Sequence, residues 1–142
     1  MEEPSSHPAK TFTVTEANAL LPKVQPLVQQ LHGLRRSIAR TDEQLNQLVA
    51  QLAEGNGHPI QALREQIEQF TAHQLQLAEA FKSALTQLED IGGVLKDLDM
   101  GLVDFYSLRE GELIFLCWKS GEDQIRFWHT LEEGYAGRKL LE

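Results

Sequence analysis

The fold of this chain is decided by residues 20–52, which read LLPKVQPLVQQLHGLRRSIARTDEQLNQLVAQL. Leucine-type side chains recur in this stretch at alternating steps of four and three residues. Such a seven-residue repeat is typical of helices that wrap around one another and bury a narrow seam. The repeat predicts one long helix whose seam positions are Leu20, Val24, Leu27, Leu31, Leu34, Ile38, Thr41, Leu45, Leu48 and Leu52.

A second run with the same spacing follows a short break, GNGHP at residues 55–59. Gly55 suits the end of one helix, near Glu54, and Pro59 suits the start of the next. Because the loop is short, the two helices must run antiparallel and side by side. The second seam consists of Ile60, Leu63, Ile67, Phe70, Gln74, Leu77, Phe81, Ala84, Leu88 and Ile91.

Both seams are longer than the remaining 92–142 segment could cover. We therefore expect a second copy of the chain to cover the rest, as a homodimeric four-helix bundle or a higher homo-oligomer. Thr41 and Gln74 would fix the register of this seam, since a polar residue at a seam position commonly does so. The side chains expected in the oligomer seam are Leu27, Leu31, Leu34, Ile38, Leu45, Leu48, Ile67, Phe70 and Leu77.

The start of the first helix carries a capping signal. Thr13 stands three residues before Glu16, the capping-box pattern that satisfies free N–H groups at a helix start. Thr15 with Asn18 is the alternative cap.

Two prolines, Pro22 and Pro26, lie inside the first helical run, where each removes a backbone donor. They would either bend one continuous helix or break it, so that a new helix starts at one of them. The unbroken register of Leu20 and Val24 with the rest of the seam favours the bent, continuous helix.

The chain changes character at Gly92-Gly93. Alternating and strand-sized apolar runs follow, with Gly101 at a bulge or turn and a hairpin turn at residues 109–112. These runs predict a small, mostly antiparallel sheet of three or four strands, then a turn or short helix at 130–137. The fold class is therefore α+β, with a flexible tail at residues 1–10, a coiled-coil-like helical hairpin at 11–91 and a β-rich cap at 92–142 packed on the hairpin as one structural unit.

Composition narrows the classes of partner. The formal net charge is −8, with 21 acidic against 13 basic side chains, so we expect no nucleic-acid partner. No apolar run approaches the ~20 residues that span a bilayer, so we expect no membrane association. The single cysteine, Cys117, rules out an internal disulfide and fits a reducing cytoplasm.

Five polar residues of the second half form a candidate metal site: Asp97, Asp99, Asp104, Glu122 and His129. Carboxylate and imidazole groups on neighbouring strands could hold a divalent metal as cofactor, or could act as general acid and base. The alternative is structural: turn residues that bond their own backbone, and a packed histidine bonded to a carbonyl. Cys117 lies in the most apolar strand, where burial raises a thiol's pKa and makes it a poor nucleophile.

Arg138 follows a tight turn, Gly134-Tyr135-Ala136-Gly137. It could bind a small anion, or it could form an ion pair with Asp97, Asp99 or Asp104. The excess of acidic residues in this segment favours the ion pair.

Several short segments carry a family resemblance: Phe12-Thr13, Glu16 to Pro22, Gly93-Val94, Lys96 to Phe105, Leu116 to Trp118, Gly121-Glu122, Phe127 to His129 and Gly134 to Arg138. Through them the chain resembles a bacterial family of uncharacterised proteins, domain of unknown function 2203. The resemblance covers nearly the whole chain beyond the tail, and Tyr106 stands where the family usually has proline. It implies a small bacterial cytosolic protein and carries no implication about activity.

Taken together, the sequence favours a cytosolic interaction or scaffold protein that self-associates through its helical hairpin. The alternative is a metal-dependent enzyme or metal sensor that uses the acidic and histidine residues of the last third. Whether the protein is an enzyme stays open at this point.

Overall fold

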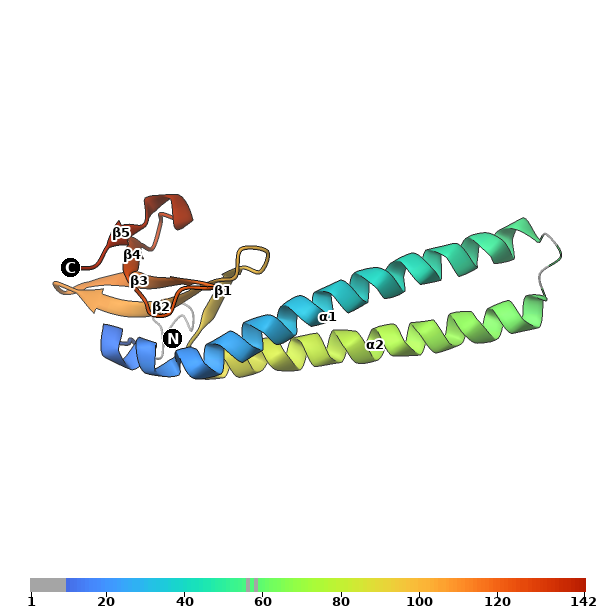
Figure 1. The fold of residues 1–142 in the computed structure, drawn as a ribbon, viewed down its shortest axis with the longest axis horizontal. Coiled ribbons are helices and arrows are strands. Elements are labelled where there is room, and N and C mark those ends of the chain that lie inside the picture. The colour runs from blue at the N-terminus through green and yellow to red at the C-terminus, as the bar shows by residue number, and fades with distance from the viewer. Residues whose placement is uncertain (1–9, 56, 58) are drawn as a thin grey trace, which may run out of the picture. The chain divides into compact units, whose positions relative to one another are not determined.

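The structure, a computed structural model, describes residues 10–55, 57 and 59–142. Two long helices form a hairpin and a five-stranded antiparallel sheet follows, which confirms the α+β class (Figure 1). The chain divides into two compact units. The first, called the sheet unit, combines the chain up to Gln29 with Leu85–Glu142; the second, called the arm, is Gln30–Ala84. The predicted tail lies almost entirely outside the described residues.

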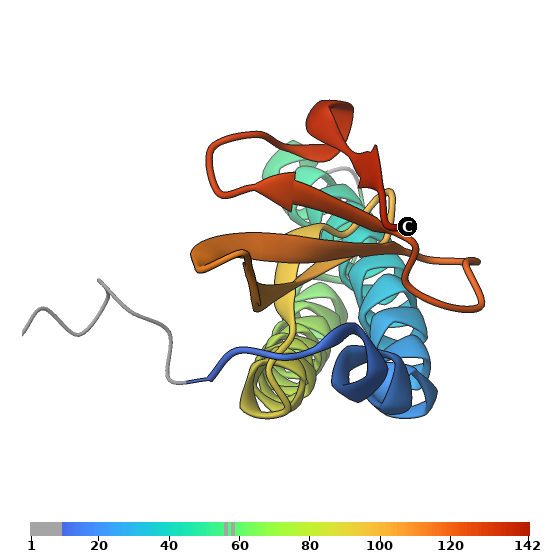
Figure 2. The same ribbon diagram turned by 90° about the vertical axis from the view of Figure 1, so that its left-hand side faces the viewer.

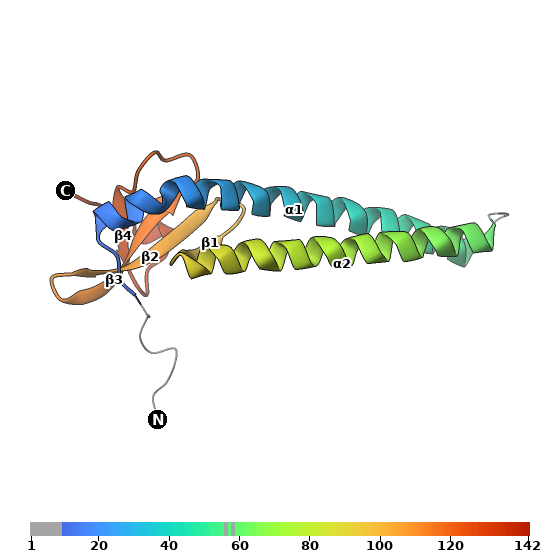
Figure 3. The same ribbon diagram turned by 90° about the horizontal axis from the view of Figure 1, so that it is seen from below.

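Helix α1 spans Val14–Glu54 and helix α2 spans Ile60–Asp90. Within the arm the two helices run side by side, as Figures 1 and 3 both show. Leu31, Thr41 and Leu63 are buried at the seam between them. The Gln74 side-chain amide on α2 donates a hydrogen bond to Asp42 Oδ1 on α1, so a polar residue of the seam joins the two helices at one register.

The prolines do not break α1, which runs through both Pro22 and Pro26. Both prolines are exposed, whereas Leu21, Val24 and Val28 on the opposite side are buried. Packing of this apolar face offsets the lost backbone hydrogen bonds, so the helix continues across a sequence that would end an isolated one.

The predicted capping box is confirmed at the start of α1. Glu16 N donates to Thr13 Oγ1 at 3.1 Å, and Thr13 N donates to Glu16 Oε1 at 2.9 Å. At the other end, Gly55 takes a positive φ of 67°, the conformation that ends helices. None of the described helices is both long and apolar enough to cross a membrane.

The sheet has one strand more than the three or four that the sequence predicts. Its strands are β1 Val94–Asp97, β2 Leu102–Arg109, β3 Glu112–Lys119, β4 Phe127–Thr130 and β5 Lys139–Leu140, in that spatial order. The extra strand is the two-residue β5, which pairs with β4 after a short 3₁₀ helix at Tyr135–Gly137. Two residues are too few to show an alternating pattern, so the sequence gives no signal for β5.

The β2–β3 turn sets the register of the central pair. Glu110 and Gly111 both take positive φ, 51° and 82°, as a two-residue type I′ hairpin requires. Residues whose numbers are symmetrical about this turn therefore face each other, from Arg109 opposite Glu112 to Leu102 opposite Lys119.

One face of the sheet covers the helices of its own unit (Figure 2). Phe105 packs edge-on against Phe12, the residue two before α1, with ring centroids 5.7 Å apart. Asn18 on α1 accepts a hydrogen bond from Ile125 N at 2.7 Å. Val103 and Trp118 on this face are fully buried. The residues that alternate with them point to the opposite face, and the candidate site lies there.

Candidate metal centre

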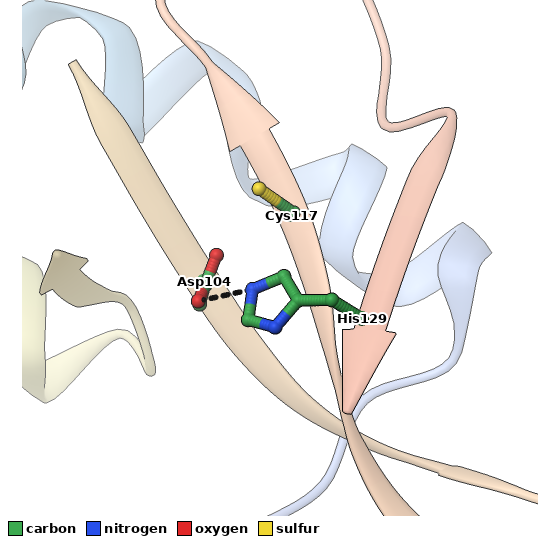
Figure 4. Close-up of side chains that lie close together, drawn as sticks. All are labelled: Asp104, Cys117 and His129. Carbon is green, nitrogen blue, oxygen red and sulfur yellow. Dashed lines mark hydrogen bonds and ion pairs between the residues drawn. The ribbon is translucent and has the colours of Figure 1, made fainter. Parts of the chain in front are cut away.

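Three side chains meet on the face of the sheet turned away from the helices: Asp104 of β2, Cys117 of β3 and His129 of β4 (Figure 4). Asp104 lies directly opposite Cys117 in the β2–β3 ladder. Cys117 faces Phe127 across the β3–β4 ladder, and His129 is two residues further along, so it shares the same face. The strand register alone thus brings one carboxylate, one thiol and one imidazole together.

The three groups are close and almost inaccessible to solvent. One donor atom from each residue lies within 4.8 Å of the other two. Only 1% of Asp104, 1% of Cys117 and 3% of His129 is exposed. Polar groups in such surroundings are costly unless they are paired or bind a ligand.

A hydrogen bond places a proton on one nitrogen of the His129 ring. Nδ1 lies 2.7 Å from the carbonyl oxygen of Thr130, and a carbonyl can only accept, so Nδ1 carries a hydrogen. Nε2 lies 2.8 Å from Asp104 Oδ2. This contact needs one proton between the two atoms, held either by the carboxyl group or by the ring. Nε2 is therefore the ring nitrogen that faces Asp104.

Burial changes the acidity of the other two groups. Desolvation raises the pKa of Asp104, although the charge of His129, hydrogen bonds with Cys117 and His129, and the charge of Lys96 oppose this. Desolvation together with the charge of Asp104 raises the pKa of the Cys117 thiol to about 12. In the absence of a metal ion, Cys117 is therefore a protonated thiol at neutral pH.

One atom of the cluster lacks a well-placed hydrogen-bond partner. Asp104 Oδ1 is buried and meets no donor at normal hydrogen-bond geometry among the residues that the structure describes, and the Cys117 thiol that interacts with this carboxyl group is only a weak donor. A carboxylate that served only to hold the histidine would leave this oxygen desolvated at a cost of about 1–3 kcal/mol. A cation bound among the three side chains would satisfy it.

The arrangement also excludes one class of chemistry. A cysteine nucleophile needs a histidine nitrogen free to take the thiol proton, with the other nitrogen bonded to a carboxylate. In His129 one nitrogen bonds Asp104 and the other bonds Thr130 O, so neither is available to Cys117. The raised thiol pKa opposes the same role.

The structure brings only two of the five predicted metal ligands together. Asp97, the last residue of β1, accepts a hydrogen bond from Met100 N at 3.0 Å, and Asp99 lies in the exposed turn that follows. The chain turns immediately after Asp97, so the extended strand that would have aligned these carboxylates is absent. Glu122 lies on the β3–β4 connection and bonds Lys119 N at 2.9 Å.

Arg138 forms an ion pair, but with Glu122 and not with any of the three expected aspartates. Its Nη2 atom lies 2.9 Å from both carboxylate oxygens of Glu122 and 3.2 Å from the carbonyl oxygen of Cys117. The guanidinium also stacks 4.0 Å from the centre of the Phe127 ring. Arg138 therefore binds residues of its own unit, and its hydrogen bond to the Cys117 carbonyl oxygen supports strand β3.

Cys117 is the member of the cluster that the sequence interpretation set aside. Both faces of β3 are covered, so its side chains are apolar on both faces. The sequence of this strand therefore shows no alternation that would indicate which face Cys117 is on. The two-residue turn at Glu110-Gly111 was the signal that could have found it, since the turn places Cys117 opposite Asp104.

Comparison with known proteins places the chain in a family. The model of the DUF2203 family, described as uncharacterized conserved protein, matches residues 10–141. The chain belongs to this family. Comparisons with curated proteins and with solved structures gave no match. The DUF2203 match spans both units and all three residues of the cluster, and it attaches no activity to them.

Proposed function

We propose that this protein binds a divalent transition-metal ion, with zinc the best fit, at Asp104, Cys117 and His129, and that it acts as a metal sensor. The observation that carries the proposal is the meeting of three ligand-type donors within 4.8 Å of one another, with the buried Oδ1 of Asp104 meeting no donor at normal hydrogen-bond geometry among the described residues. Thiolate, imidazole and carboxylate are the three ligand types that zinc accepts together.

Charge balance supports the same ion. A thiolate and a carboxylate carry two negative charges, which a divalent cation neutralises, so the loaded site would be uncharged inside the sheet unit. The bond from His129 Nδ1 to Thr130 O leaves Nε2 as the metal-binding nitrogen and holds the ring in place, as backbone carbonyls commonly do for metal-bound histidines.

Burial favours a sensor over an enzyme. The three side chains are 1–3% exposed, so a substrate would not reach a metal held there. A metal ion can still stabilise the strands that supply its ligands, and binding would be read out as a change in the sheet unit. A reduced thiol is required, which is why we also propose the cytoplasm as the compartment.

Cobalt titration of the metal-free protein tests this proposal directly. We expect one equivalent to bind with a thiolate-to-cobalt charge-transfer band, and protein purified without added metal to retain a transition metal on elemental analysis. Cys117→Ser, which keeps the side chain's shape, should abolish the band. Asp97→Asn is the matched control outside the cluster and should leave it unchanged. Absence of bound metal and of any cobalt spectrum would refute the proposal.

We propose, as a second function, that the arm mediates self-association and makes the protein a scaffold. The supporting observation is that most of the seam within the arm stays half-buried. These half-buried side chains are Leu34, Ile38, Leu45, Leu48, Ile67, Phe70 and Leu77. A second copy would remove more of this surface from water. Sedimentation equilibrium at tens of micromolar should give a dimer or higher oligomer, and a monomer would contradict it.

A further inference from the structure

A stripe of exposed residues follows α2 on a side of the arm that its own seam does not use. Its other members lie three, four or seven residues from Leu75, so they lie along one side of the helix. Leu75, at its middle, is 62% exposed, which is unusual for a leucine in a helix that already has an apolar seam. We call this set the outer stripe; it comprises Glu68, Thr71, Ala72, Leu75, Ala78 and Lys82.

The outer stripe borders a shallow, mainly apolar groove. The groove has a volume of about 670 Å³, and Ile67, Thr71, Ala72 and Leu75 are among its lining residues. The small side chains around Leu75 leave room for another helix to approach closely. Packed helices have axes about 8–10 Å apart.

The outer stripe is symmetrical about Leu75. Ala72 and Ala78 lie three residues before and after it, and Glu68 and Lys82 lie seven before and after. If two α2 helices crossed antiparallel at Leu75, each Ala72 would face Ala78 of the other copy. Each Glu68 would face Lys82, about 10 Å along the axis from the centre on either side. A parallel pair would instead place Glu68 against Glu68 and Lys82 against Lys82.

The distribution of charged residues along the arm also favours antiparallel pairing. The arm holds five basic and six acidic residues, so it carries little of the chain's net charge of −8. Its basic residues Arg35, Arg36 and Arg40 lie toward the end that joins the sheet unit, whereas Glu54 and Glu65, with Arg64 next to Glu65, lie toward the loop between the helices. In antiparallel arms the basic excess of one end would therefore face the acidic excess of the other.

We propose that two copies of this chain pair antiparallel through the outer stripe, with a two-fold axis at Leu75 and two reciprocal Glu68–Lys82 ion pairs. This proposal rests on the self-association proposed above, and it adds a contact surface beside the seam and a direction of pairing. The contact is isologous, because the same patch serves on both copies.

Charge reversal with sedimentation equilibrium of the full chain tests the pairing. Glu68→Lys and Lys82→Glu should each weaken the dimer about tenfold, because two attractive contacts become repulsive at once. The double variant restores opposite charges and should return the dissociation constant to near the wild-type value. Glu43→Lys is the matched control: it makes the same charge change on α1, midway between seam positions 41 and 45 and so on the side away from the seam.

Cysteine cross-linking tests the direction. Mixed Glu68→Cys and Lys82→Cys proteins should form a disulfide-linked heterodimer, while neither variant should cross-link with itself. Self-linking of Glu68→Cys would show a parallel pair and overturn the proposal. A wild-type monomer would overturn both the outer stripe and the self-association. A dimer unaffected by either charge reversal would overturn the outer stripe alone.

Discussion

At the residue scale, the candidate centre depends on where protons reside. In the metal-free protein, one proton lies between Asp104 and His129 and another is on Cys117, whose pKa is about 12. A metal ion bound to the three donor atoms would displace both of these protons, because metal ligands must be deprotonated. The electrostatics of the cluster therefore make metal affinity strongly dependent on pH.

Cobalt should bind more tightly as the pH rises. Because the Cys117 thiol proton must leave on binding, the cobalt dissociation constant should fall at least about tenfold for each unit rise in pH between about pH 6 and about pH 8. Titrations against a buffered free-cobalt concentration would measure the slope. Independence of affinity from pH would contradict the proposed ligand set.

The metal-free protein should lose stability in alkali. The Cys117 pKa is raised in the folded state from 9.0 to about 12, so folding favours the protonated thiol. Its contribution is fully present below pH 9, the ordinary thiol value, and is lost as pH rises toward 12. The loss should be on the order of 4 kcal/mol at most. Chemical unfolding at several pH values should therefore show a steeper alkaline decline for wild type than for Cys117→Ser.

At the element scale, turns determine which strand residues meet. The Glu110-Gly111 turn aligns Asp104 with Cys117, and Gly101 turns the chain from β1 into β2. Gly101 has φ of 69°, and a Cβ atom there would lie 2.4 Å from Ser120 Cβ. Its lack of a side chain thus allows the β1–β2 turn to pack against the turn after β3.

A substitution at this position should be costly. Gly101→Ala combines a positive φ with a steric overlap and should lower the free energy of unfolding by about 2–3 kcal/mol. Gly33→Ala is the matched control, because Gly33 is helical and a Cβ there meets nothing within 4 Å. That change should be neutral or stabilise by about 0.5–1 kcal/mol. Equal effects in chemical denaturation would contradict this account of Gly101.

At the scale of the whole molecule, the two proposals belong to different units. The proposed metal ligands all lie in the sheet unit, and the outer stripe lies in the arm. Metal binding and self-association can therefore be altered separately, and each has its own variants.

Metal should stabilise one unit selectively. At a free metal concentration a hundred times the dissociation constant, the sheet unit should gain about 2.7 kcal/mol. Hydrogen exchange with and without metal should show added protection in β2, β3 and β4 and little change over residues 43–71 of the arm. Uniform protection of both units, or none, would contradict a site confined to the sheet.

Local patterns in the sequence determined the helices, their ends and one strand pair. The heptad repeat, the Thr13–Glu16 capping box and the Glu110-Gly111 turn each act between neighbours in the chain, so their structures could be predicted from residue order. The continuity of α1 across Pro22 and Pro26 depends in addition on packing of the opposite face, which lies outside the reach of a local pattern.

Tertiary structure alone decided the composition of the candidate centre. His129 reaches Asp104 and Cys117 across the connection 120–126, whose length sets no strand register, and the short β5 forms only because β4 offers it an edge. The partner of Arg138 was decided in the same way, by the position of Glu122 on that connection. Contacts between distant residues depend on how strands align and long loops close, and no periodicity in the sequence encodes that alignment.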